Sequence, residues 1–238
     1  MGTESTWWSE IRGAAAGDAS ARNGFVRRYE PLIRAYLAAR WGRGPLRGDL
    51  DDTVQDVFLE CFRDRGGLEK ADPEKGSFRA FLYGLVRNVA RRLESKHAAR
   101  REAPPVAASD VESIPEDDES VTKAFERAWA QTVMREAAER QAVLAQERGD
   151  AAVKRVELLR LRFEDGLPIR DIASRWNVDP AWLHHEYARA RKEFRDIVLV
   201  VVGETEPGCD PEVEAARLLG LLANDGAPSA RRAWPVRT

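Results

Sequence analysis

An acidic segment near the middle of the sequence divides it into two parts. Residues 102–121 contain seven acidic residues, three prolines and neither lysine nor arginine. Such a segment buries too little apolar surface to offset the chain entropy that folding removes. We therefore interpret residues 102–121 as a flexible acidic linker between residues 1–101 and residues 122–203, with a C-terminal extension at residues 204–238.

The hydrophobic spacing on both sides of the linker is helical. Apolar residues recur at three- and four-residue steps in segments that begin at Phe25, Val54, Phe78, Phe125 and Val153. Either Asp51 or Asp52 is expected to cap the helix that contains Val54. The β-branched run from Ile197 to Val202 follows a helix without a breaker, so we assign it to that helix. The sequence therefore predicts an all-α chain of two small helical domains, followed by one short amphipathic helix and a tail.

Basic residues are concentrated in two clusters, although the formal net charge is only -2. The first lies on the side of the 78–93 helix opposite its apolar residues and continues to residue 101, with Glu94 as its one acid. The second consists of Arg189, Arg191, Lys192 and Arg195. Two positive patches joined by a negative linker indicate a polyanionic ligand that is contacted at two places.

Residues 167–194 have the spacing of a helix-turn-helix. Asn177 can adopt the left-handed conformation that ends a first helix, and Asp179 can cap a second helix that has Pro180 at its first position. The second helix would bury Leu183 and Tyr187 and place its N-terminal residues in a DNA major groove. A helical hairpin without DNA-binding function is the alternative.

Several classes of protein are disfavoured by the sequence. There is no apolar run of about 18 residues that could cross a membrane, and the N-terminus lacks the features of a secretory signal, so we expect a cytoplasmic protein. The two cysteines, Cys61 and Cys209, suggest neither a disulfide framework nor a zinc site. No metal-ligand spacing, phosphate-binding loop or nucleophile motif is found. We expect no cofactor, no metal and no enzymatic activity; a helical carboxylate enzyme is a remote alternative.

The ordered motifs resemble those of a bacterial RNA polymerase sigma factor of the extracytoplasmic function (ECF) type, in the sigma-70 family. Residues 25–41 are similar to the family's opening helix, and residues 49–58 resemble its D-x-E-D-x-x-Q-E-x-F segment. Residues 78–88 resemble its F-R-x-W-L...R-N helix. Residues 166–191 are similar to its G-L-x-x-x-x-I-A-x-x-L-G-I helix-turn-helix and R-A-R ending. The sequence departs from these patterns at Trp176 and Asn177, at Glu186 and at Arg92.

The resemblance implies two functional sites in residues 1–101, as sigma domain 2. The acidic segment would bind core RNA polymerase through Asp49, Asp51, Asp52, Gln55 and Asp56. Helix capping with a solvated acidic face is the alternative for these residues. The basic helix and the loop before it would recognise and melt the minus-10 element through Arg63, Arg65, Arg79, Arg87, Asn88, Arg91 and Arg92. The alternative is a solvated, arginine-rich face.

The resemblance makes residues 122–203 sigma domain 4, which reads the minus-35 element. Its candidate contacts are Trp182, His184, His185, Arg189, Arg191 and Lys192, although Trp182 could equally be a core residue. The acidic linker would thread the RNA exit path or act as a simple tether. The resemblance thus implies a promoter-specificity factor for transcription initiation, whose partners are core polymerase and promoter DNA, both duplex and melted.

The chief alternative is a stand-alone helix-turn-helix transcriptional regulator that binds duplex DNA. Such a regulator needs neither an acidic docking helix nor a track for a single strand. The family is often held inactive by anti-sigma factors, and no sequence feature here identifies one. The C-terminal extension could pack on the second domain, bind an inhibitor or contact DNA.

Overall fold

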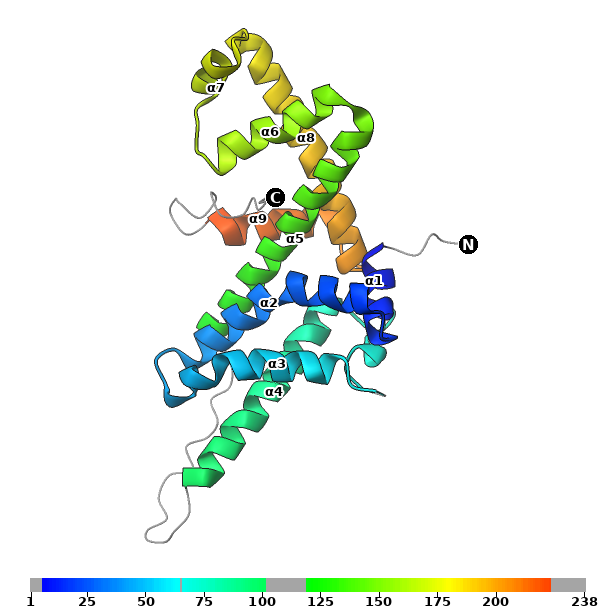
Figure 1. Cartoon of the computed structure of the whole chain (residues 1–238), viewed down its shortest axis with the longest axis vertical. Helices are drawn as coiled ribbons and strands as arrows, with labels where there is room; N and C mark the ends of the chain where they lie inside the picture. The colour runs from blue at the N-terminus through cyan, green and yellow to red at the C-terminus, as the bar shows by residue number, and fades with distance from the viewer. Residues whose placement is uncertain (1–5, 65, 102–118, 224–238) are drawn as a thin grey trace. The chain divides into compact units, whose positions relative to one another are not determined.

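A computed structural model describes residues 6–64, 66–101 and 119–223 (Figure 1). These residues contain helices and turns and no β-strand, which confirms the predicted all-α fold. Their helices are α1 (Thr6–Ala15), α2 (Ala19–Trp41), α3 (Leu50–Cys61), α4 (Phe78–Arg101), α5 (Glu119–Arg148), α6 (Asp150–Phe163), α7 (Ile169–Trp176), α8 (Pro180–Thr205) and α9 (Pro211–Ala223), with 3₁₀ turns η1 (Pro45–Asp49) and η2 (Gly67–Lys70). Arg65, residues 102–118 of the expected linker, and the tail after Ala223 lie outside the described residues.

The chain forms two compact units. The first comprises Met1–Trp129 and Glu204–Pro207, and the second comprises Ala130–Gly203 and Gly208–Thr238. The boundary therefore falls inside α5, whereas the sequence analysis placed the start of the second domain at residue 122. Among the described residues, no helix is both long and apolar enough to be a candidate membrane span.

The core of the first unit is built on α2. Asp18 caps this helix by accepting a hydrogen bond from the Ala21 amide at 2.7 Å, and Gly42 ends it with a φ of 48°. Between these ends, the buried residues follow the expected periodicity: Phe25, Tyr29, Leu32, Ile33, Tyr36, Leu37 and Trp41. α3 packs against both α2 and α4 (Figure 1). This packing leaves the outer faces of α3 and α4 available for partners.

Aromatic rings from distant parts of the sequence meet in this core. The Trp7 ring of α1 packs edge-on against Tyr29 and against Trp129 of α5, with ring centroids 6.1 and 6.2 Å apart. Tyr29 also packs against Phe78 of α4 at 5.3 Å. Trp7, Tyr29 and Trp129 are fully buried. The first turns of α5 thus belong to the first unit because their aromatic side chains complete its core.

The start of α3 differs from the sequence prediction. We expected Asp51 or Asp52 to cap this helix, but α3 begins at Leu50 and Asp49 occupies the cap position without a side-chain cap hydrogen bond. The prediction was wrong because turn η1 runs directly into the helix and moves its start toward the N-terminus. Asp51 and Asp52 instead lie in the first turn, where the helix dipole favours carboxylates.

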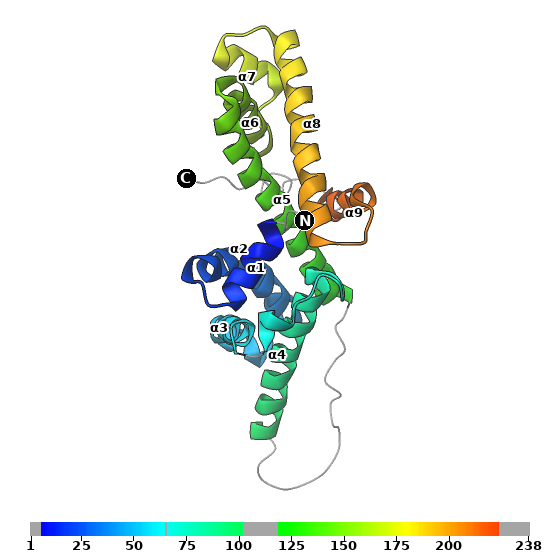
Figure 2. The same cartoon turned by 90° about the vertical axis from the view of Figure 1, so that its right-hand side faces the viewer.

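The second unit packs α6, α7 and α8 together (Figure 2). Its core includes Leu158, Leu161, Ile172, Ala173 and Leu183. The β-branched run from Ile197 to Val202 is helical within α8, as predicted. Helix α9 is the short amphipathic helix expected in the C-terminal extension.

Candidate nucleic-acid interface

The acidic face of α3 is the first candidate site. Val54, Val57 and Cys61 point into the core, which leaves the polar positions between them on the outer side of the helix. The proposed docking residues Asp49, Asp51, Asp52, Gln55 and Asp56 are all exposed. Asp51 is 76% exposed and accepts a hydrogen bond from the Arg34 guanidinium at 2.5 Å. Because the Asp49 side chain makes no cap hydrogen bond, this carboxylate too remains available to a partner.

A cavity of about 830 Å³ lies beside α4 in the same unit. Its wall includes the apolar Phe81 and Leu85 and, next to them, Asn88, Arg91 and Arg92 of α4. Turn η2 contributes Gly67 and Lys70, and the end of α3 contributes Glu60, which pairs with Arg92 at 3.0 Å. An apolar wall beside cationic side chains can accept an aromatic base while the cations contact its phosphate.

The tight packing of Gly67 positions turn η2. This residue has a φ of 50°, and a Cβ atom placed on it would lie 2.1 Å from the Glu60 carbonyl oxygen and 2.2 Å from that of Cys61. Only glycine tolerates both the close approach to the end of α3 and the left-handed backbone. No sequence motif singled out Gly67, so its role in forming the cavity wall became visible only in the structure.

The other predicted minus-10 residues lie in different environments. Arg63 lines a smaller cavity of about 280 Å³, which it shares with Arg92, and its side chain pairs with Glu60 at 3.0 Å. Arg79 is only 19% exposed because it forms ion pairs with Glu126 at 3.0 Å and Glu206 at 3.2 Å. Burial raises the pKa of Glu126, and the positive charge of Arg79 opposes that shift.

Arg87, Asn88, Arg91 and Arg92 lie in the middle turns of α4. Arg87 is half-buried, whereas Asn88 and Arg92 are exposed and lie with Arg91 on the larger cavity. The structure therefore brings Asn88, Arg91 and Arg92 together. It places Arg79 among internal ion pairs.

Glu94 joins α4 to α2. Its carboxylate accepts hydrogen bonds from Arg40 Nε at 2.6 Å, Arg40 Nη2 at 2.9 Å and Trp41 Nε1 at 2.9 Å. The Arg40 side chain is 5% exposed and that of Glu94 15% exposed. Because the one acid of the basic stripe is directed inward to these partners, its charge does not neutralise the outer face of α4.

The α7–turn–α8 segment of the second unit has the local geometry predicted for it. Asn177 adopts the left-handed conformation, with a φ of 53°. Asp179 caps α8 by accepting a hydrogen bond from the Trp182 amide at 2.8 Å. Leu183 is fully buried in the cluster that contains Ile172 and Ala173. These contacts fix the first turns of α8 and expose the opposite side of the helix.

The candidate minus-35 residues lie at the surface of α8. His184, His185, Arg189, Arg191 and Lys192 are exposed. Trp182 is 48% exposed, so it is not a core residue and its ring is accessible to a ligand. Lys192 pairs with Asp196 at 2.9 Å, while the Arg191 guanidinium lies over the Tyr187 ring at 5.7 Å.

Glu186 has an internal role that the sequence analysis missed. Its carboxylate pairs with Arg155 of α6 at 3.2 Å, and the same arginine pairs with Glu193 at 2.9 Å. The acid that departs from the family pattern therefore joins α8 to α6. In the part of the chain that the structure describes, no group of three or more His, Cys, Asp or Glu residues could hold a metal ion.

Comparison with known proteins gives a family match within the first unit. Residues 25–101 match the family model described as sigma-70 region 2. The matched range runs from within α2 to the end of α4, and it contains both the acidic face of α3 and the cavity beside α4. A search of curated proteins found no match.

Proposed function

We propose that this chain, whose residues 25–101 match sigma-70 region 2, is a transcription initiation factor of the ECF type in the sigma-70 family. It binds core RNA polymerase, recognises the minus-10 and minus-35 promoter elements and helps to open the DNA. The observation that carries this proposal is the position of the family match. It covers an exposed acidic helix face and, next to it, a cavity with cationic and apolar walls.

In this proposal α3 docks on polymerase. Asp49 just before the helix and Asp51, Asp52 and Asp56 on it face solvent, while the other side of the helix is anchored in the core. Such a face suits a basic surface on the partner, because complementary charges speed association and disfavour wrong orientations. The contact needs no rearrangement of α3, since the docking residues are already exposed.

The cavity beside α4 accepts the melted strand. Extruding a base costs a few kcal/mol of stacking and pairing free energy, which the protein must offset. Phe81 offers an aromatic surface, and Arg91 supplies positive charge for the phosphates. Arg92 adds a second positive charge when it exchanges its ion pair with Glu60 for a phosphate. Arg79 supports this site indirectly, because its ion pairs with Glu126 and Glu206 fix the first turn of α4.

Helix α8 reads the duplex of the minus-35 element. His184 and His185 lie near its N-terminus, where a recognition helix contacts base edges. Arg189 and Lys192 lie one to two turns further along and suit phosphate contacts, which position the helix without reading sequence. In domain terms, residues 1–101 act as sigma domain 2 and residues 122–203 as sigma domain 4.

The protein acts in the cytoplasm and supplies no bond-forming chemistry of its own, because polymerase performs the synthesis. An anti-sigma factor is the expected class of regulator. Core polymerase is required for tight promoter binding, which distinguishes this function from that of a stand-alone regulator. A stand-alone regulator would retard duplex DNA in a gel-shift assay without polymerase.

Docking is tested by pull-down of core polymerase with the double variant Asp51→Lys and Asp52→Lys. We expect the variant to lose association, because two exposed carboxylates become cations. Arg34→Ala is the matched control, since it breaks the Arg34–Asp51 ion pair without reversing the charge of the face. Retained association of the double variant would refute the docking role.

Strand opening is tested with the double variant Arg91→Ala and Arg92→Ala. We expect it to bind core normally but to lose permanganate reactivity of the melted promoter strand. Arg27→Ala, which removes one exposed positive charge on α2, controls for the loss of an arginine that does not line the cavity. The template is selected from a genomic fragment pool transcribed with purified core polymerase. Failure of the unaltered protein to direct transcription from any fragment would overturn the proposed function.

A further inference from the structure

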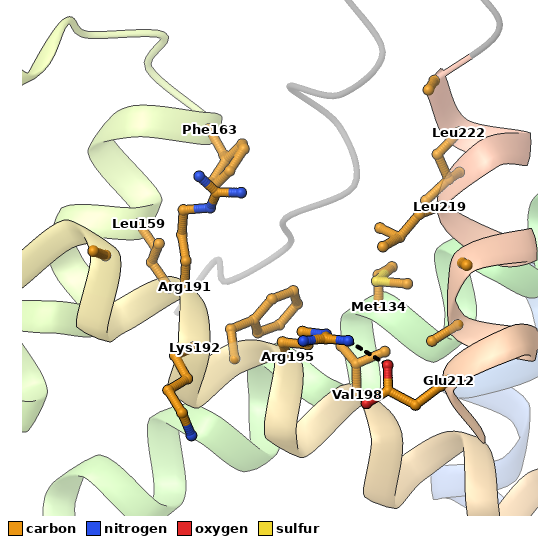
Figure 3. A pocket seen from close by; sticks show the side chains of 15 residues that line it. Met134, Leu159, Phe163, Arg191, Lys192, Arg195, Val198, Glu212, Leu219 and Leu222 are labelled. Atoms are coloured by element: carbon orange, nitrogen blue, oxygen red, sulfur yellow. Dashed lines mark hydrogen bonds and ion pairs between the residues drawn. The ribbon is translucent and has the colours of Figure 1, made fainter.

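A cavity of about 720 Å³ lies within the second unit, between α9 and the helices α5, α6 and α8 (Figure 3). Its lining is mostly apolar and includes Met134, Leu159, Phe163, Phe194, Val198 and Leu219. Its volume falls within the range of about 300–1,000 Å³ that is common for pockets that bind small organic molecules. Arg191 and Lys192, which are also candidate promoter contacts, line it on the α8 side.

Helix α9 forms one wall and leaves apolar side chains uncovered there. Leu218 is fully buried, whereas Leu219 is 51% exposed although it lines the cavity. Leu219 and Leu222 of α9 lie on the opposite side of the cavity from Phe163 of α6 (Figure 3). Apolar side chains around a hollow gain transfer free energy when an apolar group fills it. The cavity is therefore suited to a hydrocarbon chain.

The positively charged side chains of Arg191 and Arg195 lie at the edge of the same cavity. Arg195 forms an ion pair with Glu212 of α9. Across the residues that the structure describes, no carboxylate forms an ion pair with Arg191, whose guanidinium lies beside Phe163 in Figure 3. A guanidinium binds a carboxylate through two parallel hydrogen bonds. An apolar interior with a cationic edge complements a molecule that has a hydrocarbon chain and one anionic head.

We propose that the second unit binds a single-chain fatty carboxylate in this cavity. The hydrocarbon chain packs against Met134, Leu159 and Leu219, and the carboxylate pairs with Arg191. Each methylene group moved from water into the cavity strengthens binding about fourfold. Dodecanoate should therefore bind about 15-fold more tightly than decanoate, which has two fewer methylene groups.

The test is isothermal titration calorimetry of the full chain with decanoate and dodecanoate below their micelle concentrations. Leu219→Trp places a larger ring in the cavity and should weaken binding by more than about tenfold. Val213→Trp is the matched control, because Val213 is 68% exposed on α9 and does not line the cavity, so this variant should bind as the unaltered chain does. Arg191→Gln should weaken binding of the carboxylates, and dodecyltrimethylammonium should bind poorly. Circular dichroism verifies that each variant keeps its helices.

Each of the following results would overturn the proposal: equal affinity for the two chain lengths, equal affinity for the cationic amphiphile, unchanged binding by Leu219→Trp, or no binding of the monomeric carboxylates. Binding only to phosphatidylglycerol vesicles would also overturn it, and would identify a membrane surface instead. Sedimentation without ligand tests whether a second copy of the chain occupies the cavity. A dimer that is lost in Leu219→Trp would assign the cavity to the dimer contact. Neither polymerase nor promoter enters these measurements, so their failure leaves the proposed function unaffected.

Discussion

Replacing Glu94 by alanine should destabilise the first unit by about 3–5 kcal/mol. The Glu94 carboxylate accepts three hydrogen bonds, two from Arg40 and one from Trp41. Because the Arg40 side chain is only 5% exposed, removing Glu94 leaves this buried charge without its carboxylate partner. Losing one partner of a buried ion pair typically costs this amount. At a urea m-value of about 2 kcal/mol/M, the unfolding midpoint would fall by about 1.5–2.5 M.

A double variant separates the charge effect from lost packing. Arg40→Met together with Glu94→Leu removes both charges and keeps apolar volume, so it should be more stable than Glu94→Ala alone. Glu74→Ala is the control, because Glu74 is an exposed acid in the loop before α4. Its unfolding midpoint should stay within the error of the unaltered protein.

Urea unfolding followed by circular dichroism and tryptophan fluorescence measures these differences. The Trp41 indole donates directly to Glu94, so the fluorescence signal reports on the altered site. If Glu94→Ala lowered the free energy of unfolding by less than about 1 kcal/mol, the Glu94 carboxylate would not be compensating the buried charge of Arg40. A double variant no more stable than Glu94→Ala would contradict the same reasoning.

Three further predictions concern single residues. Gly67→Ala should lower the free energy of unfolding in urea by more than about 2 kcal/mol, because the added Cβ would meet two carbonyl oxygens at a residue with left-handed backbone. Gly48→Ala is the control, because a Cβ at Gly48 meets open space and should leave the stability unchanged. Burial raises the pKa of Cys61 to about 12, so at pH 8 this thiol is about a thousandfold less ionised than a thiol of pKa 9.0. Iodoacetamide should therefore alkylate the exposed Cys209 and not the buried Cys61. Equal labelling of the two cysteines by mass spectrometry would contradict this. His184→Ala should reduce discrimination at one minus-35 base pair by about 1–3 kcal/mol, measured by transcription from promoter variants, and an unchanged preference would assign His184 to the scaffold.

Local patterns in the sequence were sufficient to predict most helices. The turn between α7 and α8 is the strongest case, because Asn177 and Asp179 end one helix and cap the next through contacts within a few residues. The inward direction of Leu183 likewise follows from helical periodicity alone. The start of α3 was predicted wrongly, because the 3₁₀ turn before this helix has no hydrophobic periodicity that marks where the helix begins.

The sequence by itself determined the helical class, the acidic and basic faces, and the family resemblance, since all three depend on the order and spacing of nearby residues. Only the tertiary structure decided which charged residues face inward: Arg79 and Glu94 are directed to partners 47 and 54 residues away, a separation that helical periodicity does not encode. It likewise decided that Trp182 is exposed and that Trp129 completes the first unit. Burial is a property of the surfaces that meet after folding, and those surfaces come from segments far apart in the chain.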